Sequence, residues 1–444
     1  MNMTDCLTTT SQHSQTPAAP EPIFRRFSDL TNAGFSIDWG IASFLVISHC
    51  LVLVLTPLAY IVAPAGLWKV MLAWTLLHAL IAAIATTAYS HRLIAHRAAK
   101  DVRLPTHVIF LGLQLFALQG SVRRWSAQHV IHHAVDKTGQ HYLDPYSTTW
   151  FDTGWRNFLW SHMLTYLFNH PPSREFDAAM NAKMHPAIIW QDQHYVPLLI
   201  LANFALPIAL GIGLAGWLGG FCLLVASSAG YVLAHHNTWT VNSVTHLWGF
   251  RKGLISTARN NYIWLGPLGE GNHHADHHDH PRDFRNGFGW SGWVLDPTRY
   301  VILSLRALGL VKGLNRASRW QEAHIITRRK VRDTKAKSQS VVWQRWEQKV
   351  ALLGDEWLAA AQTWDQFKLE KIQLSQQIRQ AGADRMAAAR ERMGDTQEEF
   401  LRDLQARRAA VRAELHDARK RLKERREAFF TALSELKQAN MAVA

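Results

Sequence analysis

Four long apolar segments constrain the fold of this chain more than any other feature of its sequence. Segments 41–63 and 67–88 are separated by a short turn at 64–66, and each is long enough to cross a bilayer as a helix. Segments 195–214 and 217–233 form a second such pair, joined by a Gly-rich turn. A helix satisfies its own backbone hydrogen bonds inside lipid. The sequence therefore predicts an all-α membrane protein with four transmembrane helices in two hairpins.

Lysine and arginine concentrate on one side of these predicted hairpins. The outer turns, 64–66 and 211–216, contain neither residue, whereas the segments on the other side contain many. Cytoplasmic segments carry the excess of Lys and Arg. Three cysteines without a CxxC pattern fit a reducing compartment. Both termini and the polar segments between the hairpins are therefore expected in the cytoplasm.

Histidines gather in the polar segments next to the hairpins. The pattern His-x-x-His-His occurs at 129–133 and at 274–278, accompanied by His91-x-x-x-x-His96 and by NSVTH at 242–246. Residues three and four positions apart share a helix face, and neutral imidazole is a common ligand of transition metals. One such box is usually accidental, and surface histidines are the alternative explanation. Four boxes in this order predict a metal site assembled from distant parts of the chain.

The boxes and their flanks are similar to those of one enzyme family. The matching segments are HRLIAH (91–96), WSAQHVIHH (125–133), DPYS (144–147), TWTVNSVTHLWG (238–249) and GEG…HADHHDHP (269–281). They resemble the membrane fatty-acid desaturases, in particular the acyl-CoA delta-9 (stearoyl-CoA-like) branch. The resemblance covers residues 35–310 and implies an O2-dependent enzyme of a bacterial inner membrane. Such an enzyme inserts a cis double bond, delta-9 above all, into a saturated acyl chain.

The resemblance also implies a cofactor and a ligand set. A cytosolic histidine-rich helical cap would hold two Fe²⁺ ions per chain. A ferredoxin or a small haem protein would supply electrons, because the three cysteines form no iron–sulfur pattern. Asn242 would act through a bound water. The implied histidine ligands are His91, His96, His129, His132, His133, His246, His274, His277 and His278.

The last box leaves one ligand open. The family usually has one residue fewer between GEG and the first histidine, so counting from Gly269 selects His273, whereas counting back from His277 selects His274. We prefer His274 because it preserves the His-x-x-His-His spacing. Nearby carboxylates could orient ligated rings, although helix capping explains them equally well. These carboxylates are Asp136, Glu270, Asp276 and Asp279.

Basic residues near the boxes are candidates for binding the substrate head group. The acyl-CoA branch often has a basic–acidic pair just before the second box, where this chain has Ala127 and Gln128. Acyl-CoA, an acyl carrier protein thioester and a lipid-bound acyl chain therefore remain alternatives. Contacts to substrate phosphates or to lipid headgroups are expected from Arg123, Arg124, Arg251 and Lys252.

The end of the chain lies outside the resemblance. Apolar residues recur at spacings of three and four from Trp343 to Phe367, and a weaker series runs from Leu401 to Leu436. This pattern predicts a helical hairpin or coiled coil, which could mediate self-association. The basic run Arg419–Arg426 is read as a solvated helix face, with anionic lipid or an acidic partner as alternatives. The expected divisions are a disordered segment at 1–34, a desaturase domain at 35–315, a basic linker at 316–338 and the helical extension at 339–444.

Two other functions are considered. A membrane di-iron hydroxylase acting on lipids or alkanes would share the histidine boxes, but NSVTH and DPYS favour a desaturase. A non-catalytic membrane scaffold would work through the C-terminal helices and hold no iron. The net charge of +14 alone suggests nucleic acid, and four membrane spans argue against that partner.

Overall fold

The computed structural model describes residues 24–138, 144–254, 256–261, 270–289, 291–388 and 396–443. Within these ranges, only the backbone is described at 135–138, 251, 382–388, 396–398 and 443. The chain divides into two compact units. The first unit ends at Arg316, and the described residues of the second unit follow from Ala317.

Among its described residues, the first unit contains three helical stretches long and apolar enough to cross a membrane, namely Trp39–Val62, Leu67–Ala95 and Tyr195–Leu247. The first is helix α3. The second joins α4 (Leu67–Ile84) to a π-helix, η1 (Ala85–Ala95). At about 1.5 Å per residue, the second stretch exceeds the roughly 30 Å hydrocarbon core. The stretch is therefore longer than an untilted crossing of the apolar layer requires.

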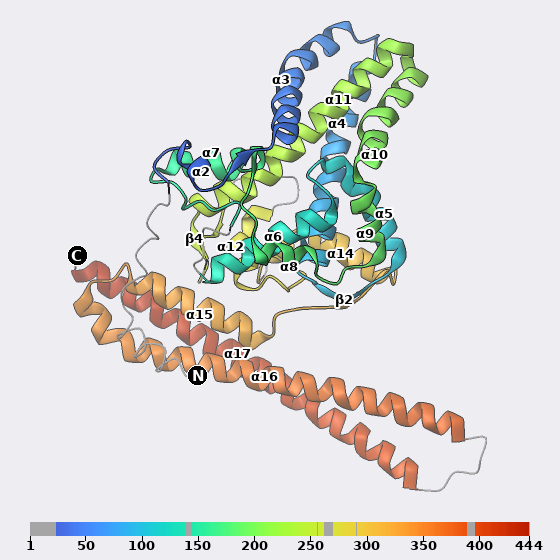
Figure 1. The fold of residues 1–444 in the computed structure, drawn as a ribbon. Helices are drawn as coiled ribbons and strands as arrows, with labels where there is room; N and C mark the ends of the chain where they lie inside the picture. The colour runs from blue at the N-terminus through green and yellow to red at the C-terminus, as the bar shows by residue number, and fades with distance from the viewer. Residues whose placement is uncertain are drawn as a thin grey trace. The chain divides into compact units, whose positions relative to one another are not determined.

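The third stretch contains a break that reverses its direction. It comprises α10 (Tyr195–Ile200), the π-helix η5 (Leu201–Ala205) and α11 (Leu206–Leu247). Within α11 the backbone leaves helical geometry at Ala215 and at Gly216, whose φ of 62° suits glycine. A Cβ on Gly211 would overlap the backbone of Gly219, so the two arms are in contact. Figure 1 shows the chain turning back on itself along α11. The break coincides with the predicted division between 195–214 and 217–233.

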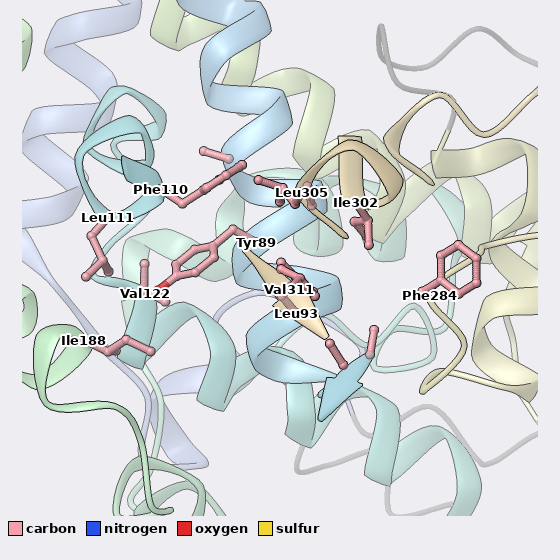
Figure 2. Packing of buried hydrophobic residues seen from close by; sticks show 14 residues of the cluster. Tyr89, Leu93, Phe110, Leu111, Val122, Ile188, Phe284, Ile302, Leu305 and Val311 are labelled. Atoms are coloured by element: carbon pink, nitrogen blue, oxygen red, sulfur yellow. The ribbon is translucent and has the colours of Figure 1, made fainter. Parts of the chain in front are cut away.

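The cap consists of short elements packed around the end of η1. Tyr89 and Leu93 of η1 contact a buried apolar cluster that includes Phe110, Val122 and Ile302 (Figure 2). Strand β2 (Ala99–Val102) pairs antiparallel with β6 (Val311–Leu314) beside this cluster. The other helices of the cap are α2 (Asp29–Asn32), α5 (Leu104–Gln114), η2 (Leu115–Ala117), α6 (Val122–Thr138), α7 (Gly154–His162), η4 (Leu164–Leu167), α8 (Arg174–Met180), α9 (Pro186–Gln193), η6 (Glu270–His273), α12 (His274–Asp279), α13 (Ser291–Val294) and α14 (Thr298–Ala307).

Two further antiparallel strand pairs complete the cap. Strand β1 (Ser36–Ile37) pairs with β3 (Phe168–Asn169), which fixes the entry to α3 against the segment after α7. Strand β4 (Arg251–Lys252) pairs with β5 (Arg259–Asn260), directly after the end of α11. The second pair holds the chain near the end of the long helix.

The described part of the second unit consists of three helices with their own core. Helix α15 (Arg319–Lys335) begins at a capping box formed by Ser318 and Gln321. Helices α16 (Ser340–Ala388) and α17 (Thr396–Val443) form a long antiparallel hairpin (Figure 1). Its buried residues follow the predicted heptad series. They include Trp343, Val350, Trp357, Leu374, Leu404, Val411, Phe429 and Leu433.

Candidate metal centre

A widened helical turn brings the first two histidines together. His91 and His96 lie five residues apart at the end of η1, where the amide of His96 donates to the carbonyl of His91 at 3.0 Å. A π-helix pairs residues five positions apart and often marks a functional site. The two ring centroids are 4.9 Å apart. Five-residue spacing, which is awkward on an α-helix, therefore places both side chains on one face here.

Five buried histidines converge in a first group, which we call site 1. Their ligand nitrogens all lie within 4.8 Å of one another. The Nε2 atom of His277 is 2.8 Å from that of His91 and 3.2 Å from that of His96, and His96 Nε2 is 2.9 Å from that of His129. Site 1 consists of His91, His96, His129, His133 and His277.

Four more buried histidines form a second group, site 2. The Nε2 atom of His246 lies 2.8 Å from that of His274 and 3.2 Å from that of His132. His278 completes the group. Its ring stacks on that of His133 from site 1, with centroids 3.9 Å apart. The two groups are therefore direct neighbours.

Helical periodicity explains how each His-x-x-His-His box serves both sites. On α6, His129 and His133 are four residues apart and face site 1, whereas His132 faces site 2. On α12, His274 and His278 face site 2, and His277 faces site 1. Each box thus gives two ligand atoms to one group and one to the other.

The donor sets fit divalent transition metals. Imidazole nitrogen binds zinc at about 2.0–2.1 Å, so two ligands at a right angle around such a metal stand about 3 Å apart. The measured nitrogen separations bracket this value. Both ring nitrogens of His133 are buried without a hydrogen-bond partner among the described residues. A metal ion would satisfy one of them.

Burial keeps these rings in the form that binds metal. Burial and the neighbouring histidines lower the pKa of His129, His133 and His277 well below its ordinary value. A neutral ring offers a lone pair, whereas a protonated ring offers none. These imidazoles are therefore neutral and ready for a cation at pH 7.

Polar partners fix the outer nitrogens of ligands in both sites. Asp144 lies 3.0 Å from Nδ1 of His132, and Thr257 Oγ1 lies 2.8 Å from Nδ1 of His246. In site 1, Glu270 lies 3.6 Å from Nδ1 of His91. Such contacts leave Nε2 for the metal and orient the ring. Asp144 belongs to the DPYS segment, which sequence reasoning matched without giving it this role.

A buried charge cluster holds Glu270 beside His91. Arg92 has no exposed side-chain surface and donates to Glu270 at 2.6 Å and to both oxygens of Asp296, at 2.7 and 3.0 Å. Asn286 also donates to Glu270. Burial raises the pKa of Glu270, although Arg92 opposes the rise. Only tertiary structure brings Asp296 to Arg92, so sequence reasoning missed both.

The other candidates near the boxes occupy different environments. His273 lies outside both groups, with Nδ1 3.2 Å from Asp276 and its ring against Gly287. Asn242 is buried one turn before His246 and donates to the hydroxyl of Tyr166 at 3.2 Å. The Asp279 carboxylate accepts from the amide of Leu254. The side chain of Asp136 lies outside the described residues.

The described side chains among the four predicted head-group residues have different environments. Arg123 donates to the carbonyl of Met180 at 2.9 Å and to Asp192 at 3.1 Å, so its charge has a partner within the protein. Arg124 and Lys252 are exposed on α6 and β4. The side chain of Arg251 lies outside the described residues.

Comparison with known proteins agrees with this geometry. The chain is 31% identical to the stearoyl-CoA desaturase of Sus scrofa over 254 residues, which cover 56% of this chain and 67% of that protein. It is 32% identical to the sn-2 palmitoyl-lipid 9-desaturase of a Nostoc species over 251 residues, covering 55% and 81%. No protein-family model matches the chain.

A third relative extends the match. A probable acyl-CoA desaturase of Schizosaccharomyces pombe is 28% identical over 305 residues, 67% of this chain and 59% of that protein. All three relatives carry desaturase names, and two buried histidine groups suit such oxidoreductases. The chain therefore belongs to the membrane fatty-acid desaturases and is an enzyme of that family.

Proposed function

We propose that the chain is an O2-dependent acyl desaturase that introduces a cis double bond, at the delta-9 position, into a saturated acyl chain. The observation that carries this proposal is the pair of adjacent, buried, all-histidine groups. The matches to the stearoyl-CoA desaturase and to the sn-2 palmitoyl-lipid 9-desaturase support the same chemistry. Two Fe²⁺ ions per chain are the proposed cofactor.

The proposed reaction needs a metal because an alkyl C–H bond offers no acidic proton. Two iron ions, when bound, would supply the oxygen activation that side chains lack. The overall change converts one acyl chain, O2, two electrons and two protons into the unsaturated chain and two waters. The nine histidines of sites 1 and 2 would hold the ions, and Asn242 is proposed to act through a water. Both histidine groups are buried, so the ions would be held away from bulk solvent.

The proposed substrate class is a long saturated acyl chain. Relatives bear names of both thioester and lipid substrates, so acyl-CoA, an acyl carrier protein thioester and a lipid-bound chain are the proposed head-group classes. Because Arg123 is paired with Asp192, we assign head-group contacts to Arg124, Arg251 and Lys252. A ferredoxin or small haem protein is the proposed electron donor.

We propose a four-span topology in a bacterial inner membrane, with both histidine sites and both termini on the cytoplasmic side. The stretch 217–247 would span about 45 Å as a helix, more than the hydrocarbon core. In this topology His246 lies outside the hydrocarbon core, on the same side of the membrane as His91 at the end of η1. The turn between α3 and α4 and the break at 215–216 contain no Lys or Arg, which supports this orientation. The C-terminal helices are a proposed self-association surface.

Expression in a desaturase-deficient bacterial host tests the proposed reaction. Fatty-acid methyl esters should gain a cis double bond at carbon 9, and His96→Ala should abolish the new product while leaving the protein in the membrane. A hydroxylated product would instead indicate a hydroxylase. A chain that purifies without iron and changes no fatty acid would indicate a scaffold.

A further inference from the structure

A stripe of exposed basic side chains runs along α17 in the second unit. The packed seam of this helix advances by steps of four and three residues from Val411 to Leu422. Each seam residue is followed directly by an exposed basic residue, so the basic residues repeat at the same spacing and share one face. Arg426, three residues after Lys423, continues this spacing, so the stripe consists of Arg412, His416, Arg419, Lys423 and Arg426.

Charges on the opposite flank of α17 are neutralised, whereas the stripe is not. On that flank Arg407 lies 2.6 Å from Glu370 and Arg425 lies 2.8 Å from Glu356 of α16. On the stripe, Arg412 and Arg419 form no ion pair with the residues that the structure describes. Lys423 approaches only Glu427, at 3.8 Å, where both side chains are mostly exposed. Such an exposed pair contributes little.

A groove between α16 and α17 adjoins this stripe. It has a volume of about 500 Å³, and Leu415, the neighbour of His416 in the chain, forms part of its wall. On α16, Ile372 in the groove and nearby Leu369 are 46% and 57% exposed. The remaining lining residues are Trp364, Lys368, Lys371, Ser375, Gln376 and Arg379. Exposed apolar side chains therefore alternate with cations in and beside the groove. The carboxylate of Glu370 accepts from Arg407 on the opposite flank of the helix pair.

We propose that the stripe and groove bind the anionic headgroups of a phospholipid bilayer. Cations flanked by exposed Leu and Ile are typical of helices that lie at a membrane interface, and juxtamembrane basic residues are attracted to anionic lipid. The peptide chain is continuous from Arg316 to Ala317, so this unit is always tethered to a membrane-embedded one. Tethering gives lipid a high effective concentration. Exposed Leu369 and Ile372 favour lipid over an acidic protein, and the proposal does not depend on desaturase activity.

The reactivity of Lys423 tests this contact in the full chain. The chain is reconstituted into nanodiscs of phosphatidylcholine alone or with one third phosphatidylglycerol, and amine acetylation is followed by mass spectrometry. Lys423 should react several-fold more slowly on the anionic discs, and salt at about 0.5 M should remove the protection because it screens exposed charges. Lys349, paired with Glu435 at 2.8 Å, is the internal control whose rate should not change.

Matched variants separate the stripe from general charge. Each Arg near an anionic surface contributes about a fivefold factor in binding. Arg412→Gln with Arg419→Gln should therefore weaken the contact on the order of 25-fold and abolish protection of Lys423. Arg345→Gln with Arg421→Gln removes the same charge from exposed positions off the stripe, and this variant should retain the protection of Lys423.

Three results would overturn the proposal. The first is an equal acetylation rate of Lys423 on the uncharged and the anionic nanodiscs. The second is protection of Lys423 that persists in the variant with Arg412→Gln and Arg419→Gln. Protection by an added acidic ferredoxin on uncharged discs, without protection on anionic discs, would assign the surface to an acidic protein. The salt titration uses the unmodified chain, so the test stands even where a variant fails to fold.

Discussion

Asp144 fixes the orientation of one site 2 histidine. Its carboxylate lies 3.0 Å from Nδ1 of His132 and also accepts from the amide of Tyr146 at 2.9 Å. Both His132 and Asp144 are buried, so neither can turn to water. A carboxylate on Nδ1 selects the tautomer whose Nε2 lone pair points into the site.

Asp144→Asn should weaken metal binding without unfolding the protein. The amide can still accept from Tyr146, but it loses the charge that holds the ring, and such changes weaken metal affinity by about 10–100-fold. Competition with a chelator during iron loading measures the effect. Asp152→Asn, which alters an exposed pair with Arg156, is the control. Equal chelator sensitivity of the two variants would contradict a positioning role.

Arg92 balances two buried carboxylates, and its loss should be costly. Arg92→Leu leaves Glu270 and Asp296 without their cation inside the protein. Breaking a buried pair in this way costs about 3–5 kcal/mol of unfolding free energy. Arg156→Leu breaks an exposed pair with Asp152 and should cost less than about 1 kcal/mol. Denaturant unfolding in mild detergent compares them, and similar midpoints would refute the assigned importance of the cluster.

At the scale of elements, the arms of the broken α11 helix meet through glycine. The Gly211 backbone touches that of Gly219 across the turn. Small residues permit this close approach between helices in lipid. Gly211→Ala should therefore force the arms apart and cost about 1–3 kcal/mol, whereas Gly213→Ala meets nothing within 4 Å. The midpoint temperature of thermal inactivation in detergent should fall for Gly211→Ala alone. Equal midpoint temperatures for the two variants would contradict the hairpin packing.

Local sequence pattern predicts the elements well and their partners less well. Apolar length locates α3, α4 and the break near Gly216, and the histidine spacing selects the residues that gather in sites 1 and 2. The pattern does not show that each box divides between two sites, because that depends on how α6 and α12 face each other. Contacts such as Arg92 with Asp296 join residues 204 positions apart. No local periodicity encodes them.

The widened turn of η1 is a feature that residue spacing alone does not predict. A spacing of five residues, as between His91 and His96, does not place two side chains on one face of a regular α-helix. The π-helical backbone places both rings in site 1. The sequence contains the odd spacing, but the backbone geometry that resolves it depends on packing of Tyr89 and Leu93 in the cap.

At the scale of the whole molecule, two units with separate cores share one chain. The unit ending at Arg316 contains both histidine groups, and two of the three relatives match little more than half of the chain. The unit beginning at Ala317 contains its own apolar core. We therefore assign the oxidation chemistry to the first unit and the lipid contact to the second.

Metal analysis of the purified chain tests the central claim most directly. Two transition-metal sites built from histidine predict about two irons per chain. His274→Ala removes a site 2 nitrogen and should lower the content to about one, with loss of the unsaturated product. His273→Ala, its neighbour outside both groups, should keep about two irons. An active chain without iron, or equal iron loss in both variants, would contradict the account.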